Sequence, residues 1–360
     1  MFDQARRQFH DSGFRMTERH ALPSRIAMSL VAGLLVALVP ASATFADAPG
    51  PTDYRSTVTS VETKDGLPLP EGVNISIEGH DSFLALTVPR GVAAEVPGYE
   101  LEPYLNIDQN CTASENQHSM STWYNKDRFG GDASTDLVDN DADPDWKIIG
   151  SSCSVAWHDH RIHYMSSIPP INAEPGDVIV TDSIALTIDG RDVVVHVESE
   201  LIAPASQLPA IVGAIVALAI LAAMWKRMTL TLLVFPVSAI GLIIGGAQYL
   251  WAPAETGPNI SVVALPFIAT AAGVAAYVAR QQGLLFTNGS VLLSGTMLTM
   301  WAILRTDVFS YALLPTSLPY WVDRSATAVV AVSGIAFVSS SMQQLWRMSI
   351  VRPQTELATD

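Results

Sequence analysis

Basic residues are scarce in this chain. Lys and Arg number 20 against 35 Asp and Glu, and the formal net charge is -15 over 360 residues. The imbalance is concentrated in residues 47–205, where 27 acidic residues oppose 8 basic ones. Such a surface repels nucleic acid and anionic lipid headgroups. We therefore expect no nucleic-acid partner. An acidic surface of this kind attracts cations or basic partners, or is simply solvated.

Cysteine is nearly absent. The only two, Cys111 and Cys153, both fall in the acidic part of the chain. Outside the cytoplasm an isolated pair of cysteines typically forms a disulfide, and we predict that bond here. The alternative is a metal-ligand role for Cys153, which precedes a cluster of histidines.

The chain also lacks the motifs of common enzymes and nucleotide-binding proteins. It contains no GxxxxGK[ST], GxGxxG, HExxH, CxxC or GxSxG. Asp159 with His160 or His163 has the groups for acid–base catalysis, but no nucleophile of recognisable context accompanies them. The sequence thus favours a protein that is not an enzyme.

The first 46 residues have the layout of a secretory signal peptide. An apolar run at 26–39 ends at Pro40, ahead of the small residues Ala41-Ser42-Ala43, and is too short for a membrane span. It follows a leader with five arginines: Arg6, Arg7, Arg15, Arg19 and Arg25. Whether this segment is cleaved or kept as an anchor, residue 47 onward lies outside the cytoplasm.

Residues 47–205 show the alternation of apolar and polar residues that is typical of strands. Residues 73–77 and 83–88 flank a turn at 78–81. Residues 184–188 and 193–197 flank Asp189-Gly190, a strong hairpin signal. No stretch has sustained helical periodicity. We predict an extracytoplasmic antiparallel β-sandwich, followed by an α-helical transmembrane bundle.

Three of the eight histidines fall within the run from His158 to Met165. We predict that residues 155–165 are largely extended and that His158 and His160 therefore face the same side. Neighbouring imidazoles suit copper or zinc. Further ligands would be His163, Met165 or His118, and Asp159 would orient an imidazole.

The alternative for the same run is a structural network. Trp157, Ile162 and Tyr164 would then belong to the core, and Asp159 would pair with Arg161. Each imidazole would bind a backbone carbonyl. Histidines that point apart, each bonded within the domain, would favour this interpretation over the metal site.

The run AWHDHRIHYMS, with GYELEPYLNI upstream and PPIN downstream, resembles an uncharacterised family of bacterial, mainly actinobacterial, membrane proteins. The resemblance covers roughly residues 65–205. It implies a signal peptide, a β-rich extracytoplasmic domain with a W-H-D-H-R-x-H-W/Y-M run, and a hydrophobic C-terminal half. His118 stands where that family usually has no histidine, which puts its role as a shared ligand in doubt.

Residues 206–346 are largely apolar. Five segments, 208–225, 228–250, 260–278, 284–304 and 326–345, are each long enough to span ~30 Å of hydrocarbon and contain no Asp, Glu, Lys, Arg or His. Residues 309–321 are apolar but too short, which predicts an interfacial or re-entrant segment. Basic residues between and after the spans favour one side, and this places the tail 347–360 in the cytoplasm.

Two functions are consistent with this organisation. The first is a membrane-anchored extracytoplasmic ligand-binding protein, with copper or zinc at His158, His160 and His163. The second is a non-catalytic structural or protein-interaction component of the cell envelope. Both imply a multi-pass protein of the cell membrane, in contact with the lipid bilayer; the second adds an envelope protein as partner.

Overall fold

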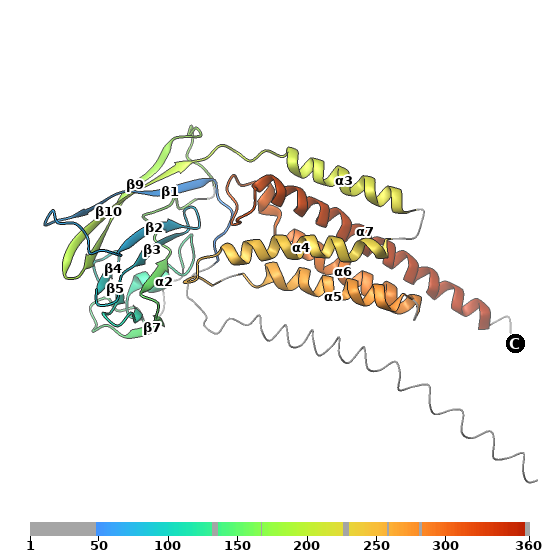
Figure 1. The fold of residues 1–360 in the computed structure, drawn as a ribbon, viewed down its shortest axis with the longest axis horizontal. Coiled ribbons are helices and arrows are strands. Elements are labelled where there is room, and N and C mark those ends of the chain that lie inside the picture. The colour runs from blue at the N-terminus through green and yellow to red at the C-terminus, as the bar shows by residue number, and fades with distance from the viewer. Residues whose placement is uncertain are drawn as a thin grey trace, which may run out of the picture. The chain divides into compact units, whose positions relative to one another are not determined.

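The computed structural model describes residues 48–131, 136–166, 168–225, 230–257, 259–280 and 283–356 (Figure 1). The predicted signal segment, residues 1–46, lies outside the described residues. Strands occupy the chain from Tyr54 to Leu201, and long helices follow from Leu208. The predicted order, a β-rich region followed by a helical C-terminal half, is confirmed.

Two antiparallel sheets make up the β-rich region. The larger one has the strand order β1-β10-β9-β4-β5-β6-β7, and the smaller one the order β2-β3-β8. The strands are β1 Tyr54–Thr63, β2 Asn74–Glu78, β3 Phe83–Thr87, β4 Ala94–Pro97, β5 Pro103–Ile107, β6 Ala113–Asn116, β7 Trp146–Gly150, β8 Ser154–Trp157, β9 Val178–Ile188 and β10 Arg191–Leu201. One short helix, α2 Met120–Tyr124, interrupts them between β6 and β7.

Both predicted hairpins are present. In the β9–β10 turn, Asp189 and Gly190 have φ of 52° and 72°, the left-handed pair that a two-residue hairpin loop requires. The β2–β3 turn contains Gly79 and His80, each with a φ of 69°. The turn residues therefore fix the registers of the two hairpins, and Ile188 pairs with Arg191.

The two sheets share one core. Val193, Val195 and Val197 of β10 are at most 1% exposed, because alternate residues of a strand face the same side. They belong to the same buried cluster as Leu84 of β3 and Trp157 of β8. Since the cluster draws residues from both sheets, the region is a β-sandwich, as predicted.

The predicted disulfide is present. Cys111 is bonded to Cys153, and their Cα atoms are 4.1 Å apart. Cys111 lies between β5 and β6 of the larger sheet, and Cys153 directly precedes β8 of the smaller sheet. The bond therefore joins the two layers of the sandwich.

The helical half contains five long helices in the described residues: α3 Leu208–Trp225, α4 Thr231–Trp251, α5 Ser261–Ala279, α6 Leu284–Ile303 and α7 Tyr320–Glu356. Four of them, all but α6, are long and apolar enough to cross a membrane. The predicted count of five spans is therefore wrong. The reason is the hydroxyl and amide residues of α6, which include Asn288 and Ser294.

Helix α6 nevertheless packs closely on α7, and several of its polar residues face inward. Asn288 and Ser294 are buried. A Cβ placed on Gly295 would lie 2.9 Å from the Cβ of Phe337, so only glycine permits this approach of the two helices. Ser294 is hydrogen-bonded to Ser238 of α4 at 3.2 Å, so part of the polarity of α6 is satisfied within the helical half.

Helix α7 begins six residues earlier than the predicted span at 326–345, and its apolar part runs over Tyr320–Met348. The expectation that no span carries an ionisable residue is therefore wrong. Asp323 and Arg324 lie in its first turns, and Arg305 Nη2 lies 2.6 Å from Asp323 Oδ1 in a buried ion pair. The predicted spans at 284–304 and 326–345 did not include these residues.

The disulfide generates a stability prediction. The double variant Cys111→Ser/Cys153→Ser should lose about 4 kcal/mol of unfolding free energy in the chain-entropy model, because the bridged residues are 42 positions apart. Chemical denaturation of the detergent-purified full chain, followed by tryptophan fluorescence, measures the loss. An unchanged midpoint would show that the sandwich layers hold together without the bond.

Candidate functional site

The histidine run begins where a strand ends. Strand β8 stops at Trp157, and residues 158–165 form turns. The prediction that residues 155–165 are largely extended is therefore wrong beyond Trp157. The cause is Asp159: its Oδ1 accepts a hydrogen bond from Arg161 N at 3.1 Å, and its carbonyl accepts one from Ile162 N at 3.0 Å. An aspartate that binds the backbone two residues on favours a turn over a strand.

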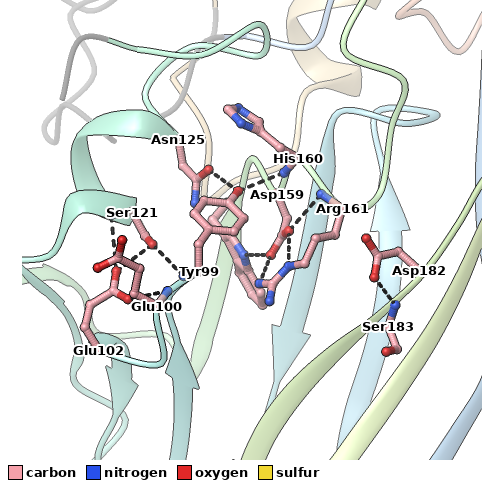
Figure 2. A network of polar contacts seen from close by, with 11 residues as sticks. Tyr99, Glu100, Glu102, Ser121, Asn125, Asp159, His160, Arg161, Asp182 and Ser183 are labelled. Carbon is pink, nitrogen blue, oxygen red and sulfur yellow. Dashed lines mark hydrogen bonds and ion pairs between the residues drawn. The ribbon is translucent and has the colours of Figure 1, made fainter.

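Asp159 is the centre of a polar network (Figure 2). Its side chain is fully buried and accepts from Trp157 Nε1 at 3.0 Å and from Arg161 Nε and Nη2 at 2.8 and 2.7 Å. Tyr99 Oη accepts from His160 N at 2.9 Å and donates to Asn125 Oδ1 at 2.5 Å. The ion pair of Asp159 with Arg161 that the structural interpretation predicted is thus present.

All three imidazoles of the run bind backbone carbonyls. His158 Nδ1 lies 2.7 Å from Ser82 O, His163 Nε2 lies 2.7 Å from Arg128 O, and His160 Nε2 lies 3.3 Å from Asp127 O. Because a carbonyl only accepts, these three ring nitrogens carry the proton. The other nitrogen of each ring is buried without a hydrogen-bond partner.

Burial keeps these imidazoles neutral. It lowers the pKa of His158 to about 4, and burial together with the nearby Arg128 guanidinium lowers the pKa of His163 to about 3. Burial also lowers the pKa of His160. At neutral pH each ring therefore presents a lone pair at its unpartnered nitrogen.

The predicted ligands do not all gather in one place. The His160 and His163 rings are 5.6 Å apart between centroids, and the His160 ring points away from the Asp159 carboxylate (Figure 2). His118 binds Asp143 O through Nδ1 at 2.8 Å, and Met165 is exposed. Within the part of the chain that the structure describes, no three His, Cys, Asp or Glu side chains are placed so that they could hold a metal ion.

A buried ion pair beside the histidines was missed by sequence analysis. Arg128 Nη2 binds Asp81 Oδ2, and Thr52 Oγ1 is hydrogen-bonded to both groups. Burial raises the pKa of Asp81 to about 6, against the opposing effect of Arg128. Asp81 belongs to the β2–β3 turn, where the sequence indicates only a turn residue, and Arg128 lies 47 positions away. No local pattern links the two.

A cavity of about 290 Å³ lies next to this ion pair. Tyr54, Arg128 and His158 line it, and each has one buried atom without a hydrogen-bond partner: Tyr54 Oη, Arg128 Nε and His158 Nε2. Asp127 and Asp307 also line it, and both are exposed. These three atoms are buried within the protein and are not exposed to the cavity; other atoms of the same side chains form its wall.

One wall of the cavity comes from the segment after α6. Asp307 belongs to the short 3-10 helix Thr306–Phe309, and Tyr311 follows it. This segment is joined to the start of β1, because Thr52 and Leu313 form an antiparallel bridge and Ala312 N donates to Asp53 Oδ1 at 2.7 Å. The cavity therefore lies at the junction of the β-sandwich with the helical half.

No protein-family model matches this chain, and neither a curated protein nor a solved structure is significantly similar to it.

The neutral histidines generate a pH prediction. The ordinary pKa of a histidine is 6.5, and folding lowers the pKa of His158 to about 4. The neutral ring therefore contributes its full stability to the fold at pH values above 6.5. That contribution is lost as the pH falls from 6.5 through about 4, because the unfolded chain then binds a proton that the folded protein does not. Between about pH 7 and about pH 5, His158 should account for a loss of about 2 kcal/mol. Asp81 acts in the opposite sense, because its raised pKa favours the folded state on acidification.

His158→Asn isolates this contribution. The asparagine amide can still donate to Ser82 O, yet it does not titrate. Denaturation of the full chain at several pH values should give a shallower acid loss in the variant than in the wild type. Parallel pH profiles would show that His158 is not the group responsible.

Proposed function

We propose that this chain is a membrane-anchored extracytoplasmic binding protein, and that its β-sandwich holds a small ligand in the cavity beside His158. The observation that carries the proposal is the cavity itself, which has a volume of about 290 Å³ and is lined by the polar side chains of Tyr54, Arg128 and His158 together with the aromatic rings of Phe129 and Tyr311. A hollow of about this size with converging polar and aromatic side chains is the usual form of a small-ligand site.

The histidine run serves this cavity as its framework. His158 forms part of the wall, and its orientation is fixed by the hydrogen bond to Ser82 O. His163 binds Arg128 O and so holds the segment that carries the Arg128 side chain. The function thus combines the ligand-binding interpretation of the sequence with its structural interpretation of the histidines.

A variant that fills the cavity tests this proposal. Gly50 lines the cavity, and a Cβ placed there meets no atom within 4 Å. Gly50→Trp should fill the space, while Gly50→Ala adds only a methyl group and serves as the control. Native mass spectrometry of the purified full chain should find a bound small molecule in the wild type and in the control, and none in Gly50→Trp. Identical spectra for all three would contradict the proposal.

The arrangement of α7 supports the membrane orientation that the sequence predicts. Tyr320, the first residue of α7, has its Oη 3.4 Å from His80 Nε2 of the β-sandwich, and the apolar part of the helix ends at Met348. A helix of this length is long enough to cross a bilayer, and its two ends would then lie on opposite sides. With the sandwich outside, the C-terminal tail is cytoplasmic. This inference does not depend on how many helices cross.

Sidedness can be measured with fusions. A reporter that is active only in the cytoplasm should be active when fused after Asp360, and inactive when inserted in the exposed Asp189-Gly190 hairpin turn. The reverse pattern would overturn the orientation. Activity at both positions would show that sandwich and tail lie on one side.

A transition metal at His158, His160 and His163 is a second candidate function, although these three imidazoles are not placed together as a metal site in the described structure. The observation in its favour is that each ring has one N–H fixed by a backbone carbonyl and a lone pair on its other nitrogen, the state found in metal-ligating histidines. Saturating Zn²⁺ or Cu²⁺ would then raise the melting temperature of the wild type, and not that of His158→Ala/His160→Ala. A wild-type melt that metal does not move, with variants that melt early, assigns the histidines to the framework alone.

A further inference from the structure

One loop between β8 and β9 exposes large apolar side chains. We call residues 168–173 the isoleucine loop, because Ile171 is 94% exposed and Ile168 is 74% exposed. Met165, just before it in the chain, is exposed as well. Single apolar residues on a surface need no explanation, but several grouped at one loop indicate contact with another apolar surface.

The isoleucine loop has a shape that presents Ile171 to its surroundings. Ala173 N donates to Pro170 O at 3.1 Å, and Asn172 has a φ of 70°, so these residues form a tight turn with Ile171 at its tip. Pro169 and Pro170 have no N–H group. The loop therefore has two fewer backbone donors to satisfy when it leaves water.

The residues that precede the loop are fixed beside the helical half. The ring of Tyr164 lies 5.8 Å from the ring of Tyr54 in β1. Ser166 lines the cavity together with Asp307 and Tyr311, which follow the end of α6 by a few residues. One end of the loop therefore lies close to the end of a long helix.

The residues that follow the loop are fixed beside the linker to the helical half. Gly176 N donates to Leu201 O at 2.8 Å, and Leu201 N donates to Asp177 O at 2.9 Å. Helix α3 begins at Leu208, seven positions after Leu201. Seven extended residues span at most about 25 Å, so this end of the loop also lies near the start of a helix.

The helix ends on this side have the residues of a membrane surface. Trp251 ends α4 and Tyr320 begins α7, and both helices are apolar enough to cross a membrane. Their rings lie 4.9 and 6.4 Å from the ring of His80 in the sandwich. Since Trp and Tyr are enriched where membrane helices meet water, the bilayer surface is expected at this side of the helical half.

Charge distinguishes the loop from the rest of the sandwich. Residues 47–205 contain 27 acidic and 8 basic residues, a balance that repels anionic lipid headgroups. Residues 164–173 include no Asp, Glu, Lys, Arg or His. This neutral and apolar stretch can therefore approach a lipid surface without the repulsion that acts on the remainder of the domain.

We propose that the isoleucine loop inserts into the bilayer surface, with Ile168 and Ile171 among the lipid headgroups and the upper acyl chains. The inference rests on the membrane anchoring of the proposed function. It adds a second partner surface to the sandwich, because lipid then holds the domain in addition to the covalent linker to α3. The two isoleucines bury their apolar area in lipid instead of exposing it to water.

A fluorophore that reports on its surroundings tests the insertion. The full chain with Ile171→Cys is labelled and reconstituted in phosphatidylcholine nanodiscs. Cys111 and Cys153 are bonded to each other, so only the introduced cysteine reacts. Lipid with a nitroxide near the headgroup end of its acyl chain should quench the label at least about twofold, because interfacial segments bury their apolar side chains about 5–10 Å deep.

Two further labelled positions calibrate the measurement. Leu250→Cys reports on the helical half, because Leu250 is 83% exposed in α4 near its end, and its label should be quenched. Leu67→Cys is the matched control in the sandwich, because Leu67 is also an exposed apolar residue. Its carbonyl accepts from Thr63 at the far end of β1, about 30 Å from the start of that strand, so its label should stay unquenched.

A second substitution in the loop checks that its apolar character matters. In the chain labelled at position 171, Ile168→Asp should lower the quenching to the level of the Leu67→Cys control, because a charge is costly to take out of water. Ile168→Leu should leave the quenching as it is. Both changes are on an exposed side chain, so equal melting temperatures in detergent are expected for the two variants.

The outcomes separate this inference from the proposed function. If the label at position 171 is unquenched while the label at position 250 is quenched, the chain is anchored in the membrane but the loop does not insert. A label at position 171 with blue-shifted emission and no quenching shows that protein covers the loop, which also overturns the inference. If the label at position 250 is unquenched too, the membrane anchoring itself fails.

Discussion

The ion pair between Asp81 and Arg128 is the interaction on which the rest of the site depends. It joins the β2–β3 turn to the segment after α2, and that segment supplies the carbonyls of Asp127 and Arg128 that hold His160 and His163. A buried ion pair is costly to form, and removal of one partner leaves an uncompensated charge at a cost of about 3–5 kcal/mol. The positions of His160 and His163 are therefore set by a pair of charges that lie far from both histidines in the sequence.

Much of the sandwich could be predicted, because its signals are local. Alternation in residues 184–197 and the Asp189-Gly190 dipeptide determine a hairpin through the backbone preferences of a few neighbouring residues. The disulfide could be predicted because the sequence contains an isolated cysteine pair in a region expected to be exported. The histidine run could not be predicted in the same way, since its conformation depends on which groups satisfy Asp159. The alternating pattern favoured a strand, but the hydrogen bonds of a buried carboxylate produced a turn.

In the helical half, too, some features could be predicted from the sequence and others could not. Long apolar runs predicted five membrane-crossing helices. A helix is present at each of the five positions, and four of these helices are long and apolar enough to cross a membrane. The start of α7 could not be read from hydropathy, because Asp323 and Arg324 look like a loop in sequence. Both are buried in the fold: Asp323 pairs with Arg305, and Arg324 donates to the carbonyls of Val308, Tyr311 and Ala312. Partners distant in sequence let charged residues occupy the end of a helix.

The bridge between Thr52 and Leu313 has a mechanical consequence. The chain leaves the sandwich at Leu201 and enters α3 at Leu208, and a sandwich tethered only by that linker would be free to swing above the membrane. The bridge and the bond from Ala312 to Asp53 add a second tether, on the strand that lies next to β10. Two tethers convert a pivot into a hinge with one axis. The second tether also carries Asp307 and Tyr311, so the wall that the helical half contributes to the cavity is held against the start of the first strand.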